Sequence, residues 1–171
     1  MFTRQSSRHK FRFIGYGILL LICYLLEVVP GTFPRVLGIL PMLVLTVVVC
    51  VAMFEQEMIG GLFGMAGGLL LDVPSMSWPY FNALMFLIIG IFVGLATHYL
   101  IRNMLSTALI LTTASLLFYT TVDWILFYVL PGIDRVGYFF LRYRLLAVIY
   151  TIAFVIPIYF LIRRLTRSAK T

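Results

Sequence analysis

The feature that most constrains this chain is a series of long apolar segments separated by short polar or proline-containing breaks. A helix needs about 20 mostly apolar residues to cross a bilayer, with a range of about 17–25. Six segments fit or approach this length. The sequence therefore predicts an all-α integral membrane protein with six transmembrane helices in a single domain, residues 1–171. The expected spans are Phe13–Val29, Val36–Phe54, Met58–Val73, Asn82–Ile101, Met104–Leu126 and Leu145–Ile162.

The composition also indicates membrane insertion. Hydrophobic residues make up 63% of the chain and charged residues 11%, with a mean hydropathy of +1.08. Soluble domains usually carry about 25% charged residues. The composition therefore argues against a water-soluble fold, and the short length leaves no room for a separate soluble domain.

The basic residues gather at the two ends of the chain and explain most of its net charge of +7. Lys and Arg concentrate on the cytoplasmic side of membrane proteins, next to anionic lipid. Six spans place both ends on one side, so the span number and the two basic ends agree. We therefore expect both termini in the cytoplasm and no nucleic-acid partner. The end clusters are Arg4, Arg8, Lys10 and Arg12, and Arg163, Arg164, Arg167 and Lys170.

The segment Ile59–Asp72 contains five glycines among its fourteen residues. Glycines spaced four apart lie on one face of a helix, and in lipid they let another backbone come close. The predicted third and fourth spans both carry such glycines, which indicates a packing face. The sequence leaves open whether the face receives the neighbouring span or a helix of a partner protein. Its glycines are Gly60, Gly64 and Gly68 on the third span and Gly90 and Gly94 on the fourth.

The chain is poor in side chains that could converge on a catalytic centre. It has two histidines and contains neither a G-x-S-x-G nor an H-E-x-x-H motif, so serine hydrolase and zinc protease chemistry are not indicated. The glycine-rich run lacks the Lys-Ser/Thr of a phosphate-binding loop. Cys23 and Cys50 lie in apolar segments, which favours buried free thiols. We expect no enzymatic activity, no cofactor and no metal.

A few polar side chains fall near the predicted outer ends of the spans. Ionisable residues at membrane depth usually face the interior of the bundle or a cavity. Asp72 is expected either to bond with the loop that follows it or to belong to a functional site. Glu55 and Glu57 are expected in a solvated turn between the second and third spans. The outer polar candidates are Asp72, Asn82, Asp123 and Arg142, and Trp78 would join them in a ligand pocket.

Together these parts resemble the rod shape-determining protein MreD family. The resemblance rests on a short six-span chain with basic ends, on G-L-L-L-D at Gly68–Asp72, on Asn-Ala-Leu at 82–84 and on the spaced glycines of the fourth span. The layout covers the whole chain, and specific residues match across about Gly60–Gly94. One departure is that Tyr80 and Phe81 stand where a glycine often precedes the asparagine in the family.

The resemblance implies a non-enzymatic scaffold in the bacterial cytoplasmic (inner) membrane. Such a protein binds MreC, a bitopic membrane partner, and helps connect cytoplasmic MreB filaments to the peptidoglycan synthase of the cell-elongation machinery. Its role would be to maintain cell shape and lateral peptidoglycan synthesis. The fold of the family is similar to the substrate-binding subunits of energy-coupling-factor transporters. The alternative function is therefore that of a transporter subunit that binds a vitamin or another small molecule near the outer ends of the spans.

Overall fold

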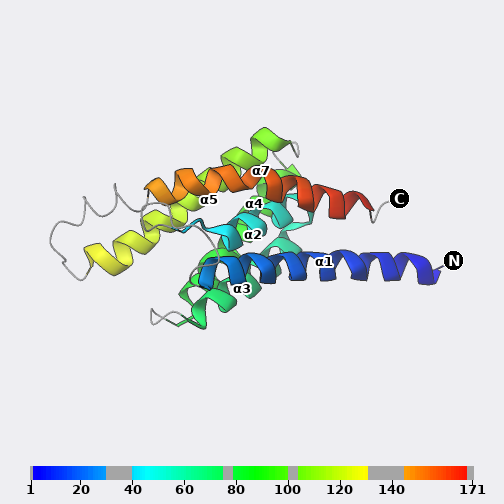
Figure 1. Ribbon diagram of the computed structural model, residues 1–171, viewed down its shortest axis with the longest axis horizontal. Helices are drawn as coiled ribbons and strands as arrows, with labels where there is room; N and C mark the ends of the chain where they lie inside the picture. The colour runs from blue at the N-terminus through cyan, green and yellow to red at the C-terminus, as the bar shows by residue number, and fades with distance from the viewer. Residues whose placement is uncertain (1, 30–39, 75–78, 100–103, 131–144, 169–171) are drawn as a thin grey trace.

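The computed structural model describes residues 2–29, 40–74, 79–99, 104–130 and 145–168 (Figure 1). These residues form helices joined by turns, and no strand occurs among them. The all-helical prediction is thus confirmed for the described part of the chain. The helices are α1 (Phe2–Val28), α2 (Leu43–Phe54), α3 (Glu57–Asp72), α4 (Phe81–Tyr99), α5 (Leu105–Trp124), its π-helical continuation η1 (Ile125–Val129) and α7 (Leu145–Ser168).

Helix α2 forms the centre of the bundle (Figure 1). It contacts α1, α3, α4, α5 and α7, and every residue from Leu43 to Met53 is buried. Its 12 residues correspond to a length of about 18 Å, less than the hydrocarbon core of about 30 Å. The helix begins at Leu43 and not at Val36 as expected, because Pro41 disfavours helical backbone in the residue before it. Residues 30–39 lie outside the described part.

The basic ends of the chain extend the terminal helices beyond the predicted spans. Helix α1 begins at Phe2 and not at Phe13, and α7 continues to Ser168 and not only to Ile162. Arg and Lys are good helix formers, and basic residues near a helix C-terminus interact favourably with its dipole. The beginning of α1 and the end of α7 lie at the same end of the bundle (Figure 1). Helix α4 ends at Tyr99, and residues 100–103 lie outside the description.

Among the described residues, three helices are long and apolar enough to cross a membrane. They are Phe81–Tyr99, Leu105–Phe127 and Ala147–Arg167. All three expose large apolar side chains, such as Phe92, Ile110 and Ile149. Exposed apolar surface of this extent is unfavourable in water and typical of a protein that faces lipid. The structure is therefore consistent with a membrane protein.

The turn before α4 contains one residue in an uncommon conformation. Tyr80 has a φ of 67°, which lies in the left-handed region that glycine adopts without strain. It stands directly before Phe81, the first residue of α4. The backbone here adopts the glycine-like turn although the side chain is a tyrosine, which costs about 1–2 kcal/mol.

Candidate functional site

The predicted glycine face forms the interface between α3 and α4. A Cβ atom added at Gly64 would collide with the backbone of Phe86, and one at Gly68 with the backbones of Asn82 and Ala83. The two helix backbones therefore touch each other, without side chains between them. Such contact gives helices strong van der Waals attraction in an apolar solvent. Only glycine leaves room for this approach.

The glycines of α4 complete the same interface from the other side. A Cβ at Gly90 would collide with the backbone of Gly60, and one at Gly94 would lie 2.5 Å from Cα of Glu57. The structure thus brings together all five predicted glycines within one chain. The face is filled by the chain's own helices, so it is not a free surface for a partner helix. We call this unit the α3–α4 hairpin.

Two further glycines of α3 were not singled out from the sequence. A Cβ at Gly61 would lie 2.8 Å from Cγ1 of Ile91 on α4. A Cβ at Gly67 would lie 3.0 Å from Cγ1 of Val44 on the central helix. Gly67 therefore lies on a second close-packed face of α3. In the sequence, Gly67 appears only as an extra glycine outside the four-residue spacing of Gly60, Gly64 and Gly68.

Asp72 closes the α3–α4 hairpin at the end of α3. Its Oδ1 accepts hydrogen bonds from the backbone N–H of Asn82 at 3.2 Å and from Asn82 Nδ2 at 2.9 Å. Its Oδ2 accepts from the backbone N–H of Ala83 at 3.0 Å. The first N–H groups of a helix have no partner within the helix and attract negative charge. Asp72 therefore caps the N-terminus of α4 from the neighbouring helix.

Asn82 carries this polar contact on to α5. Its Oδ1 accepts a hydrogen bond of 2.6 Å from the hydroxyl of Tyr119, which is buried. The predicted candidates Asp72 and Asn82 thus lie together, and their side chains are hydrogen-bonded to each other and to neighbouring groups of the protein. Asp123 is buried near the end of α5. Arg142 and Trp78 lie outside the described residues.

Glu27 repeats the capping arrangement between α1 and α2. Its Oε2 accepts a hydrogen bond of 3.0 Å from the backbone N–H of Val44, in the first turn of α2. Glu27 was not among the predicted site residues. The sequence signal was the same as for Asp72, a lone carboxylate at the end of an apolar helix that precedes another helix.

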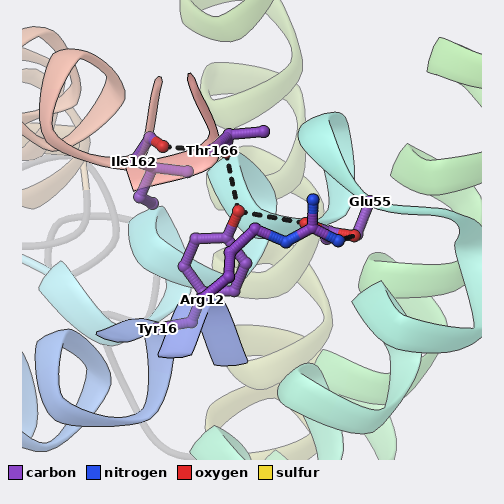
Figure 2. A network of polar contacts seen from close by, with 5 residues as sticks. All are labelled: Arg12, Tyr16, Glu55, Ile162 and Thr166. Carbon is purple, nitrogen blue, oxygen red and sulfur yellow. Dashed lines mark hydrogen bonds and ion pairs between the residues drawn. The ribbon is translucent and has the colours of Figure 1, made fainter. Parts of the chain in front are cut away.

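At the opposite end of the bundle, a buried polar network joins α1, α2 and α7 (Figure 2). Arg12 Nη2 donates to Oε2 of Glu55 at 2.9 Å, and the hydroxyl of Tyr16 donates to Oε1 of Glu55 at 3.0 Å. The Tyr16 hydroxyl also lies 2.6 Å from Oγ1 of Thr166. The Arg12 and Glu55 side chains are only 10% and 6% exposed. The expectation that Glu55 lies in a solvated turn is therefore wrong, because α1 brings a cation over that turn.

Glu57 lies beside His98 near the same end. Nδ1 of His98 is 3.5 Å from Oε2 of Glu57, and the two side chains are 45% and 30% exposed. Glu57 is thus partly exposed, in contrast to Glu55 two residues before it. The described residues hold no group of three His, Cys, Asp or Glu side chains that could bind a metal ion.

A groove separates α4 from α5 along part of their length. Its volume is about 400 Å³, and its walls include Ile89 and Phe92 on α4 and Ala114 and Phe118 on α5. Nearly all of its lining atoms are apolar. The groove faces outward on two helices that are apolar enough to span a membrane.

These features define a helical bundle with three helices long and apolar enough to cross a membrane, a glycine-packed hairpin and buried polar contacts at two places in the described part of the chain. A comparison with known protein families, curated proteins and solved structures finds no match for the chain.

Proposed function

We propose that the protein is a six-span scaffold of the bacterial cytoplasmic membrane, of the MreD type. It binds a single-span MreC-like partner and supports cell shape and lateral peptidoglycan synthesis. The observation that carries the proposal is the α3–α4 hairpin. The described residues within the range on which the resemblance rests, about Gly60–Gly94, belong to α3, α4 and the residues next to them. The glycines of this hairpin hold the two backbones in contact, and Asp72 joins the ends of the helices.

Six spans follow if α1, α2 and α3 cross the membrane together with the three helices that are long and apolar enough to do so. Helix α1 has 27 residues, and α3 has 16. The short α2 lies at the centre of the bundle, where it contacts α1, α3, α4, α5 and α7. The arrangement places the basic ends of α1 and α7 together, and the positive-inside rule assigns them to the cytoplasm. On this proposal the fold is similar to the substrate-binding subunits of energy-coupling-factor transporters.

The partner helix must dock on a surface other than the glycine face, since α3 and α4 already fill that face. The exposed apolar side chains of the outer helices are the available surfaces. Ile18 on α1, Phe92 on α4 and Ile149 on α7 are each about half exposed or more. These three positions lie on three different helices.

The test is site-specific photocrosslinking during co-expression with a single-span MreC-like protein. A crosslinkable amino acid replaces Ile18, Phe92 or Ile149, and Val48 in the buried centre serves as the matched control. We expect a crosslinked complex from at least one exposed position and none from Val48. Absence of crosslinking from all three exposed positions, together with failure to co-purify, would contradict the scaffold proposal.

The transporter alternative has less support. A ligand near the outer ends of the spans would need free polar groups there. Asp72 and Asn82 instead bond with each other, with the N-terminus of α4 and with Tyr119. A panel of vitamins that leaves the thermal unfolding temperature unchanged would agree with the scaffold.

A further inference from the structure

The C-terminal part of α7 carries three arginines on one side of the helix. Arg163, Arg164 and Arg167 follow Phe160 at intervals of three, four and seven residues, and residues with this spacing share one face of a helix. Together the four residues line a hollow of about 410 Å³, which we call the α7 hollow. No carboxylate belongs to its lining among the described residues.

The opposite face of α7 fixes the position of this hollow. Ile162 and Thr166 are buried, and Oγ1 of Thr166 lies 2.6 Å from the hydroxyl of Tyr16 on α1 (Figure 2). Leu165 packs against the core of the bundle. Because these residues of α7 face the other helices, the α7 hollow lies on the outer side of α7. It is therefore present before any ligand binds.

Two of the arginines keep their hydrogen-bond donors available. Arg164 is exposed and Arg163 is half-buried. The side chain of neither forms an ion pair or a hydrogen bond with any residue in the described part of the chain. A guanidinium group carries five N–H donors and is always charged. The α7 hollow therefore offers accessible donors and two positive charges that the described residues do not balance.

The carboxylates at this end of the bundle are engaged elsewhere. Both oxygens of Glu55 accept hydrogen bonds, one from Arg12 and one from Tyr16 (Figure 2). Glu57 lies beside His98 on the α3–α4 hairpin. The other described carboxylates lie at the opposite ends of their helices. The ligand that balances the charge of the α7 hollow is therefore an anion.

The position of the α7 hollow along the helix indicates which anion it meets. The part of α7 before the arginines, Leu145–Ile162, has no charged side chain and is about 27 Å long at 1.5 Å per residue. This length is close to the thickness of the hydrocarbon core of a bilayer, about 30 Å. When this part of α7 spans the hydrocarbon, the arginines lie at the level of the headgroups. Phe160 then lies at the edge of the acyl chains.

We propose that the α7 hollow binds the phosphate group of an anionic phospholipid. Arg163 and Arg164 donate hydrogen bonds to the phosphate oxygens, in the two-pronged geometry that a guanidinium group matches. Arg167 adds positive charge, and the ring of Phe160 contacts the first part of an acyl chain.

The proposed site differs from the general attraction between basic helix ends and anionic lipid. That attraction depends on the number of charges near the membrane surface. The α7 hollow instead requires two particular guanidinium groups beside one aromatic ring. The site does not depend on the proposed protein partner, and its test needs only the purified chain.

The first experiment compares ligands on the full-length protein in detergent by native mass spectrometry. Phosphatidylglycerol is added in one arm, a phosphate-free diglycosyl lipid with the same acyl chains in a second, and inorganic phosphate in a third. We expect phosphatidylglycerol to bind about tenfold more tightly than the glycolipid, because only it accepts charge-assisted hydrogen bonds. Equal binding of the two lipids would overturn the proposal. Inorganic phosphate that binds as tightly as phosphatidylglycerol would overturn a lipid as the source of the phosphate.

The second experiment locates the site by paired substitutions. Arg163→Ala with Arg164→Ala removes both donors, and we expect it to weaken phosphatidylglycerol binding by about tenfold or more. The matched control is Arg4→Ala with Arg8→Ala, which removes the same charge from the beginning of α1, at the same end of the bundle (Figure 1). If the control pair weakens binding as much, general charge attracts the lipid and the proposed site is wrong.

A third variant separates hydrogen-bond geometry from charge. Arg163→Lys with Arg164→Lys keeps both charges but loses the two-pronged donors, so it tests the site even if the alanine pair is less stable. We expect its affinity for phosphatidylglycerol to lie between those of the parent protein and the alanine pair. Full affinity in the lysine pair would overturn recognition of the phosphate by the guanidinium groups.

Discussion

Helix α4 packs against its two neighbours in opposite ways. On the side of α3, Gly90 and Gly94 bring the two backbones into contact. On the side of α5, the two helices make little contact, and an apolar groove of about 400 Å³, lined by residues such as Ile89 and Phe92, lies between them. Both faces are apolar, so hydrophobicity does not explain the difference.

The comparison shows what drives helix association when the solvent is also apolar. Lipid chains are as apolar as leucine, so burial of an apolar side chain between helices gains little. Close backbone contact gains van der Waals energy that lipid cannot match, and glycine makes it available. The α3–α4 hairpin is therefore the tightly held part of the bundle, and the α4–α5 contact is the loose part.

The largest loss of stability is expected at the backbone contact between α3 and α4. Gly64→Ala adds a single methyl group that would collide with the carbonyl of Phe86. Overpacking of a tight interface costs about 1–3 kcal/mol and occasionally more, and we expect the upper end because backbone cannot move aside. Thermal unfolding in detergent measures the loss.

The control for that variant is Gly17→Ala on α1. A Cβ at Gly17 would meet nothing within 4 Å, and alanine is a better helix former than glycine by about 1 kcal/mol. Gly17→Ala should leave stability unchanged or raise it. An equal loss in the two variants would mean that glycine content, and not the α3–α4 contact, sets stability.

A smaller loss is expected at the closed end of the hairpin. Asp72→Ala removes the acceptors for the backbone N–H groups of Asn82 and Ala83. Loss of a helix cap and its hydrogen bonds costs about 1–2 kcal/mol. Asp72→Asn keeps one acceptor oxygen and should unfold at an intermediate temperature. If both variants are as stable as the parent protein, the cap does not hold the hairpin together.

An increase in stability is expected from a substitution in the turn before α4. Tyr80→Gly replaces a residue at positive φ by the one that adopts this conformation without strain, and should raise stability by up to about 1 kcal/mol. Tyr80→Ala also removes the ring but keeps the strain. Equal unfolding temperatures for the two variants would show that the φ angle contributes nothing.

The smallest effect is expected in the loose contact between α4 and α5. Ala114→Leu adds side-chain volume to a residue that lines the open groove, and it should change stability by no more than about 0.5 kcal/mol. The same measurement as for Gly64→Ala makes the two faces of α4 directly comparable. A loss as large as that of Gly64→Ala would remove the distinction between them.

Much of the fold could be predicted because it depends on local properties of the chain. The length of an apolar run and the spacing of glycines are both visible in the sequence, and each of the six α-helices overlaps an expected segment, although α1, α2 and α7 have different bounds. The glycine face could also be predicted from the sequence, but the helix that packs against it could not. Glu55 shows where prediction failed. Its partner Arg12 is 43 residues away, and nothing near Glu55 in the sequence indicates a buried pair.

The sequence by itself therefore determined the all-helical class of the described part of the chain, the approximate positions of its helices and the residues able to pack closely. These follow from hydrophobicity, helix propensity and the absence of a side chain on glycine. Only the tertiary structure decided that α4 fills the glycine face of α3, that the short α2 lies at the centre, and that Asp72 caps a neighbouring helix. The reason is that apolar helices in an apolar solvent carry little periodic pattern. Their pairing depends on how backbones and side chains fit in three dimensions.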